Sequence, residues 1–157
     1  MWQFYVRGKQ LNSNQIQGAG SRKAYNFLDF YNDCKSHRER IEIESDAKTD
    51  AKNVLHLFGE GSLEDQILDF IVQHNSSEYK YKNTDVYHKG TEKDKLYKPL
   101  VDAYILPLKF FDLYVAFCIQ KTGAGWIIKS IHSNNSHSGN GETISIGSYL
   151  KITGNLI

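Results

Sequence analysis

Apolar residues change their spacing near Ser76, from the three-and-four spacing of helices to the alternation of strands. The first half therefore predicts three amphipathic helices, over residues 22–37, 45–58 and 62–74. Ser62 and Asp65 stand three apart at the start of the third, where a Ser hydroxyl can accept from a free N–H of the first turn.

Two short strands are expected among these helices. Residues 2–7 alternate and are rich in aromatic side chains, and residues 40–44 alternate as Ile, Glu, Ile. The segment between the first strand and the first helix, residues 8–21, is rich in Gly, Ser, Asn and Gln, which predicts an irregular loop.

The second half predicts strands. Residues 79–88 alternate, and Leu113–Gln120 and Trp126–His132 flank a turn with two glycines, which is the pattern of a β-hairpin. A polar loop, residues 133–142, should be mobile, and 143–153 alternate as a final strand. Residues 96–111 are ambiguous, because two prolines confine any helix to the stretch between them.

This order of elements predicts one α+β domain spanning residues 1–157. Residues 1–76 should be mainly helical and residues 77–157 mainly sheet. The helices would pack on a curved antiparallel sheet formed mainly by residues 79–153. The expected core is apolar and comes from both halves: Phe27, Phe30, Leu55, Leu68, Ile71, Val115, Phe117 and Ile127.

Composition is that of an ordinary globular chain, with 40% hydrophobic and 24% charged residues among 157. The net charge of +1 excludes a strongly basic nucleic-acid coat, although the halves differ in sign. Residues 1–75 carry nine Lys and Arg against eleven acids, and residues 76–157 carry ten Lys against seven. No apolar stretch is long enough to span a bilayer, and the start lacks a secretory signal pattern, so no membrane partner is expected.

Cysteine and histidine usage limits the chemistry. Cys34 and Cys118 form no disulfide framework or CxxC pair, so both thiols should be buried and the compartment reducing, which predicts a cytoplasmic protein. His132 and His137 stand five apart, but no third ligand has a convincing spacing. Neither a phosphate loop nor a dinucleotide fingerprint occurs, and we expect no metal and no cofactor.

Polar side chains within the predicted sheet form the best candidate site. His88 ends one strand, Tyr114 lies within the next, and Ser130 and His132 share one face of the returning strand. Lys129 and Ile131 should point to the other face. A metal-free set of His, Tyr, Ser and Lys suits RNA cleavage, in which a base removes the 2′-hydroxyl proton and an acid protonates the leaving oxygen. The alternative is that the His is exposed or hydrogen-bonded and the Tyr simply packs.

Three segments resemble a ribonuclease family: Asp85–His88, Leu113–Val115 and Ile127–His132. Together they are similar to the C-terminal sheet of RelE-type mRNA-interferase toxins, most of all MqsR-like toxins, in the wider group of barnase, EndoU, colicin and RelE-like ribonucleases. The resemblance covers roughly residues 62–135. It implies a metal-independent endoribonuclease with RNA as substrate and a cognate antitoxin or immunity protein as partner.

The resemblance assigns roles by position. Tyr114 stands where the family has a strand Tyr, and His132, two after Ser130, where it often has Lys. The family Gln before Asp-Val-Tyr is replaced by Thr84. The expected catalytic residues are His132, Tyr114, His88, Lys129 and Ser130. The expected substrate-binding residues are Lys80, Lys82 and Lys89.

Two other functions fit the same sequence. A non-catalytic protein-binding module, such as an immunity protein or phage-encoded inhibitor, suits a small chain with ten Tyr, because Tyr gives contact area at low entropy cost. A small-ligand-binding α+β domain is the third. Convergence of His88, Tyr114 and His132 in an open groove would favour the nuclease, and burial of all three would favour the binding module.

Overall fold

The structure is a computed structural model, and it describes residues 3–6, 9–12 and 22–134. Its helices are α1 (Phe27–Ser36), η2 (Arg38–Arg40), α2 (Ser45–Leu55), α3 (Leu63–Gln73) and η3 (Ser76–Glu78). Its strands are β1 (Gln3–Val6), β2 (Lys9–Asn12), β3 (Ile41–Ile43), β4 (Lys80–Val86), β5 (Leu100–Pro107), β6 (Asp112–Ile119) and β7 (Trp126–Ser133). No helix in these described ranges is both long and apolar enough to cross a membrane.

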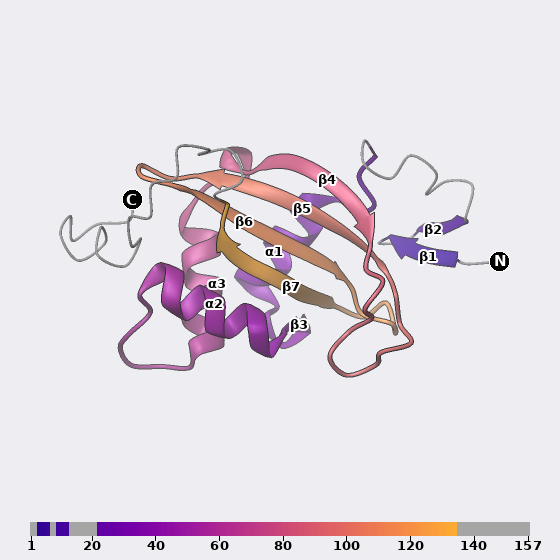
Figure 1. The fold of residues 1–157 in the computed structure, drawn as a ribbon, viewed down its shortest axis with the longest axis horizontal. Coiled ribbons are helices and arrows are strands. Elements are labelled where there is room, and N and C mark those ends of the chain that lie inside the picture. The colour runs from indigo at the N-terminus through magenta and orange to yellow at the C-terminus, as the bar shows by residue number, and fades with distance from the viewer. Residues whose placement is uncertain (1–2, 7–8, 13–21, 135–157) are drawn as a thin grey trace.

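The main sheet has five strands in the order β3-β7-β6-β5-β4, and Figure 1 shows it as a twisted layer. Strands β4 to β7 are antiparallel neighbours along the chain. Strand β3 instead pairs parallel to β7, with Ile41 opposite Trp126. The α+β class is confirmed, but the expectation of an antiparallel sheet is wrong at this edge. A parallel partner lies far along the chain, so no local turn signals it.

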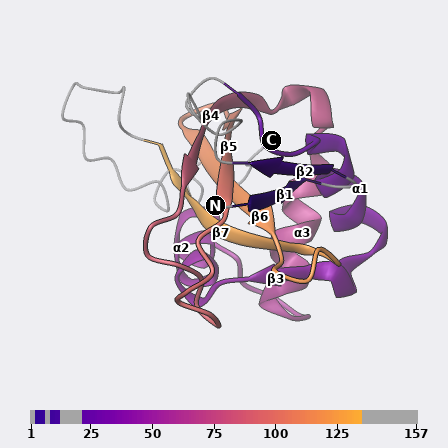
Figure 2. The same ribbon diagram turned by 90° about the vertical axis from the view of Figure 1, so that its right-hand side faces the viewer.

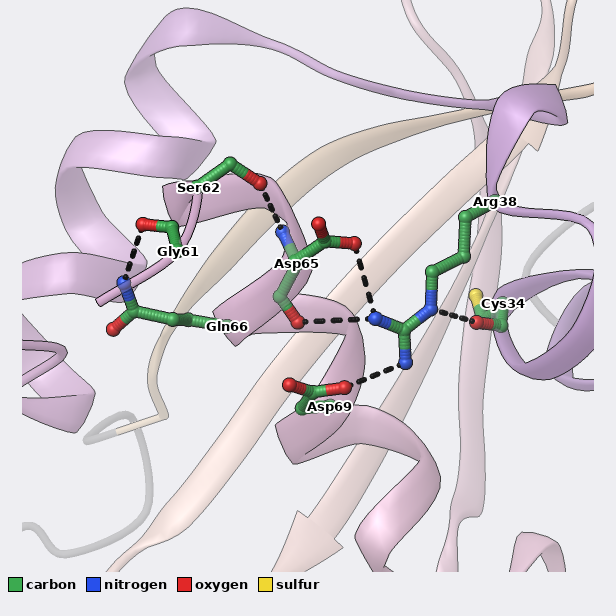
Figure 3. Close-up of polar contacts among 7 residues, drawn as sticks. All are labelled: Cys34, Arg38, Gly61, Ser62, Asp65, Gln66 and Asp69. Carbon is green, nitrogen blue, oxygen red and sulfur yellow. Dashed lines mark hydrogen bonds and ion pairs between the residues drawn. The ribbon is translucent and has the colours of Figure 1, made fainter. Parts of the chain in front are cut away.

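Helices α1 and α3 lie together on one side of the sheet, as the two ribbon views agree. Figure 3 shows the polar contacts that fasten them: Arg38 donates to the carboxylates of Asp65 and Asp69, at 3.1 and 2.7 Å, and to the carbonyl of Cys34. One guanidinium thus bridges the end of α1 to α3. Helix α2 packs against β7 through the buried Ala47, Ala51 and Leu55.

Aromatic rings fill the core between α1 and the sheet. Phe30 stacks on Phe117 with ring centroids 3.9 Å apart, and Trp126 meets both rings edge-on. Of the expected core residues, all are buried except Phe27, which is partly buried and packs against the core. Cys34 and Cys118 are buried free thiols, as expected. Burial raises the pKa of both, so they remain protonated.

The helix predictions are confirmed with shifted ends. Helix α1 begins at Phe27, five residues later than expected, because Asn26 caps it by accepting from the N–H of Leu28. Helix α2 ends at Leu55, where His56 adopts a left-handed conformation with φ of 53°. Ser62 caps α3 by accepting from the N–H of Asp65, as predicted.

Two segments differ from the sequence interpretation. Lys9–Asn12, expected within an irregular loop, is strand β2, paired antiparallel with β1. Leu100–Pro107, left ambiguous with room for a helix, is strand β5, which lies between β6 and the edge strand β4. Of the expected mobile loop at 133–142, only the first two residues are described. The rest of the loop and the final strand expected at 143–153 lie outside the described residues.

Candidate functional site

Tyr114 and His132 form one cross-strand pair of the β6–β7 hairpin. Their neighbours Val115 and Ile131 are buried in the core, so the alternation of strands places Tyr114 and His132 on the opposite face. Their rings stack, with centroids 4.5 Å apart and planes 13° apart. Both residues remain half-buried. The structure therefore joins the two residues that the sequence placed at the centre of the site.

Lys82 adds a cation to this pair. Its ammonium lies over the Tyr114 ring, 5.3 Å from the centroid. A register shift between Tyr81 and Asn83 leaves Lys82 as an extra residue in a β-bulge of the edge strand β4. The bulge re-aims the side chain across β5 toward β6. Lys82, Tyr114 and His132 together are called the bulge site below.

Electrostatics keep the Tyr114 phenol protonated. Burial raises its pKa, and the negative charge of Asp85 raises it further. The phenol is therefore a hydrogen-bond donor at neutral pH. His132 Nδ1 lies 2.9 Å from the carbonyl oxygen of Ser133. With the ring hydrogen on Nδ1, that nitrogen donates to the carbonyl and Nε2 keeps a lone pair for an incoming proton.

Ser130 and Lys80 flank the bulge site. Ser130 is half-buried, pairs with Ala116 and lies on the same face as His132, as predicted. Lys80 is exposed at the start of β4, and its ammonium donates to the carbonyl of Ser77 over 3.5 Å. Ser130 lies on β7 with His132, and Lys80 lies on β4 with Lys82.

Lys129 has a different environment. Its ammonium is buried, 2.5 Å from Glu44 Oε1 and 3.1 Å from the carbonyl oxygen of Gly90, and it lies 3.7 Å from the centroid of the Tyr87 ring. A second bulge, between Ile128 and Ser130, breaks the strict alternation from which its direction was predicted. Its charge is already balanced by Glu44, so Lys82, whose ammonium lies over the Tyr114 ring, is the better cation for a substrate.

His88 and Lys89 follow β4, in the connection to β5. They are exposed, and no hydrogen bond, ion pair or ring contact joins either residue to Tyr114 or His132. Lys89 lines a separate pocket of about 240 Å³ beside Glu44 and Glu92. The anticipated convergence therefore includes two of its three members, with Lys82 in place of His88.

The bulge site combines three chemical capacities. The His132 imidazole can transfer a proton, Tyr114 can donate a hydrogen bond and stack, and Lys82 can neutralise a phosphate. Within the described residues, no three His, Cys, Asp or Glu side chains gather as metal ligands would. The arrangement suits proton transfer on an anionic, aromatic substrate.

Sequence reasoning missed a buried carboxylate that holds the start of α1. Asp102 on β5 is fully buried and accepts hydrogen bonds from the N–H groups of Ala24 and Tyr25 and from the Thr84 hydroxyl. The available signal was one Asp within the apolar run of residues 100–106, which is costly unless the carboxylate is hydrogen-bonded.

Comparison with known proteins finds no relative. No family model, no curated protein and no solved structure matches the chain.

Proposed function

We propose that the chain is a metal-independent endoribonuclease whose active centre is the bulge site. The observation that carries the proposal is the convergence of His132, Tyr114 and Lys82 from three strands on the face of the sheet opposite the core. Aromatic rings beside an exposed cation match the two features of single-stranded RNA, its base faces and its phosphates. The resemblance to RelE-type toxins supports the same activity.

In this reaction His132 Nε2 takes the proton of a 2′-hydroxyl. The 2′-oxygen then attacks phosphorus and forms a 2′,3′-cyclic phosphate, while the bond to the 5′-oxygen breaks. The leaving oxygen takes a proton from the Tyr114 hydroxyl, and the His132 imidazolium returns its proton to Tyr114. Lys82 balances the charge that builds up on the phosphorane oxygens. Every group is then ready for another turnover.

The test is cleavage of a labelled single-stranded RNA by purified protein. His132→Ala should lower the rate by roughly 10²–10⁴-fold, the usual contribution of a proton-transfer group, with an unchanged thermal midpoint. His37→Ala is the matched control, because His37 is exposed on the α1–β3 connection. Products should end in a 2′,3′-cyclic phosphate, and chelators should leave the rate unchanged.

A parallel test follows growth and total RNA integrity in bacteria induced to express the chain. Parent protein should stop growth and degrade RNA, and His132→Ala should do neither. Equal activity of His132→Ala and parent, or loss of activity with EDTA, contradicts the proposed centre. A parent that cleaves no RNA contradicts the enzyme and leaves the protein-binding module as the function of this face.

A further inference from the structure

A second pocket lies on the helix side of the sheet, beside the start of α1. Its volume is about 650 Å³, within the range of small-molecule sites. Aromatic rings make up much of its wall, with polar groups around them: Tyr25, Phe27, Tyr79, Tyr104, Lys23 and Ser77. It shares no residue with the bulge site.

The pocket rings are held in place by the surrounding fold. Phe27 lies 4.4 Å from the Tyr104 ring and 5.0 Å from the Tyr79 ring. The hydroxyls of Tyr25 and Tyr79 donate to the carbonyls of Leu100 and Ile71, at 2.6 and 2.7 Å. These contacts hold the wall rings in fixed positions before any ligand binds.

Tyr104 is the exception among the pocket tyrosines. Its side chain is only 3% exposed, yet its hydroxyl has no hydrogen-bond partner in the part of the chain that the structure describes. Buried hydroxyls nearly always have partners, so the Tyr104 hydroxyl is a group of the pocket wall that a ligand atom would satisfy; because it has almost no accessible surface, the ligand reaches it by displacing the side chains that cover it. A phenol can both donate and accept, which suits the mixed edge of a nucleobase.

Charge and position connect this pocket with the bulge site. Lys23 lies over the Tyr81 ring, 5.4 Å from its centroid, and Lys80 reaches Ser77 of the pocket wall. Tyr104 lines the pocket, whereas the next residue, Ile105, pairs with Tyr114. The two sites thus occupy opposite faces of β5, and only the edge strand β4 separates this part of β5 from the sheet margin.

We propose that this pocket holds one nucleotide of the single-stranded RNA whose scissile phosphate lies at the bulge site, a step that rests on the proposed function. The base stacks among the rings and bonds the Tyr104 hydroxyl, and Lys23 pairs with its phosphate. The strand passes around the β4 edge, where Lys80 and Lys82 are exposed. The pocket thereby selects the nucleotide near the cleaved bond.

Binding is measured without cleavage, by titrating the protein with nucleoside monophosphates, the matching nucleosides and a 2′-O-methyl oligonucleotide, which lacks the attacking hydroxyl. Tyr104→Phe should weaken nucleotide binding by roughly threefold to tenfold, the worth of one hydrogen bond. Its thermal midpoint should not fall, because the hydroxyl that it removes has no hydrogen-bond partner among the described residues. Lys23→Gln should weaken the binding of monophosphates and leave the binding of nucleosides unchanged. Lys35→Gln, on the exposed end of α1, should change neither affinity.

Each outcome bears on the pocket separately from the active centre. The proposed nucleotide pocket is overturned if no mononucleotide binds at concentrations of about 10 mM. It is also overturned if Tyr104→Phe and Lys23→Gln leave the binding unchanged. RNA cleavage that depends on His132 would survive that result. Nucleotide binding that responds to both variants supports the pocket, even where the parent cleaves no RNA and the proposed endoribonuclease is rejected.

Discussion

Two lysines at β-bulges, Lys82 on β4 and Lys129 on β7, share a local arrangement but differ in burial and in their charged partners. Each is the extra residue of its bulge, and each ammonium lies over a tyrosine ring. Lys129 is buried and bonded to Glu44, whereas Lys82 is exposed and carries no carboxylate partner among the described residues. The Lys129 charge is neutralised within the fold, and the Lys82 charge has no such partner among the described residues.

The difference teaches that the neighbour decides the role of a cation. A buried lysine must have a counter-charge, because an unpaired ammonium in the interior is costly. Glu44 supplies it from the start of α2, and its second oxygen accepts from the N–H of Glu92 in the β4–β5 connection. The Lys129 contacts thus connect β7, the start of α2 and the β4–β5 connection, while Lys82 is exposed.

The sharpest way to break this comparison is to remove the buried cation. Lys129→Ala leaves Glu44 partly buried without its partner, and we expect a loss of about 3–5 kcal/mol in unfolding free energy by urea titration. The double variant Lys129→Met with Glu44→Gln removes both charges and should recover much of that loss. A loss below about 1 kcal/mol for Lys129→Ala would show that the pair does not hold the fold.

Another buried charged group, Asp102, sharpens the comparison, because N–H groups and a hydroxyl balance it instead of a cation. Asp102→Asn turns an acceptor into a donor facing one of those N–H groups, which should cost about 1–3 kcal/mol at pH 7. Tm and urea midpoints against the parent measure it. Thr49→Ala, on an exposed face of α2, is a control expected to stay near the parent.

Asp102 also predicts a pH dependence. Burial raises its pKa in the folded protein above the usual value, so the folded state binds this proton more tightly than the unfolded chain does. Its contribution to stability is therefore full below about pH 3.9 and declines as pH rises through the folded pKa. Urea unfolding across that window should show this decline in the parent and not in Asp102→Asn; parallel curves would contradict it.

A smaller effect is expected from the loop that carries the Gly90 carbonyl to Lys129. Gly90 has φ of 74°, and a Cβ there would lie 2.1 Å from the carbonyl oxygen of Lys95. Gly90→Ala should therefore cost more than about 1 kcal/mol. Gly123→Ala is the matched control, since its φ is 77° but nothing lies within 4 Å of the added Cβ. Equal losses in thermal unfolding would show that backbone strain alone, without the clash, sets the cost.

The smallest change in stability is expected at the open lysine. Lys82→Ala should alter unfolding free energy by less than about 0.5 kcal/mol, because its side chain is exposed. RNA cleavage should nevertheless fall by roughly tenfold or more, because a cation beside the scissile phosphate is lost. Lys52→Ala on α2 serves as the exposed control. Unchanged cleavage by Lys82→Ala would remove this lysine from the proposed mechanism.

The sequence predicts the parts of the fold that local pattern determines. The hairpin was expected at Leu113–Gln120 and Trp126–His132, and β6 and β7 match it within a residue or so at each end. Gly123 takes the positive φ that the turn required. The pairing of Tyr114 with His132 follows from the register of this hairpin. The centre of the candidate site could therefore be predicted from the local pattern.

Other features depend on partners that no local pattern shows. Strand β5 was missed because Pro99 and Pro107 suggested helix limits, although Pro107 simply ends the strand. With β5 ambiguous, Tyr104 could not be placed in a pocket wall. The bulges at Lys82 and Lys129 insert one residue without a sequence signal, and Glu44 lies 85 residues from the lysine that it neutralises.

The parallel pairing of β3 with β7 has a consequence for the order in which the chain folds. The parallel pairing joins Ile43 of β3 to Ile128 of β7, far along the chain. During synthesis β3 therefore leaves the ribosome long before its partner strand. Once synthesis has passed α3, helices α1, α2 and α3 are complete, but β4 to β7 of the sheet on which they pack have not yet been made. Closing so long a loop late favours slow folding, since non-local pairs give their stabilisation only after the entropy of closure is lost. The apolar faces of a nascent chain halted before residue 126 remain exposed, which makes such a fragment a natural client of chaperones.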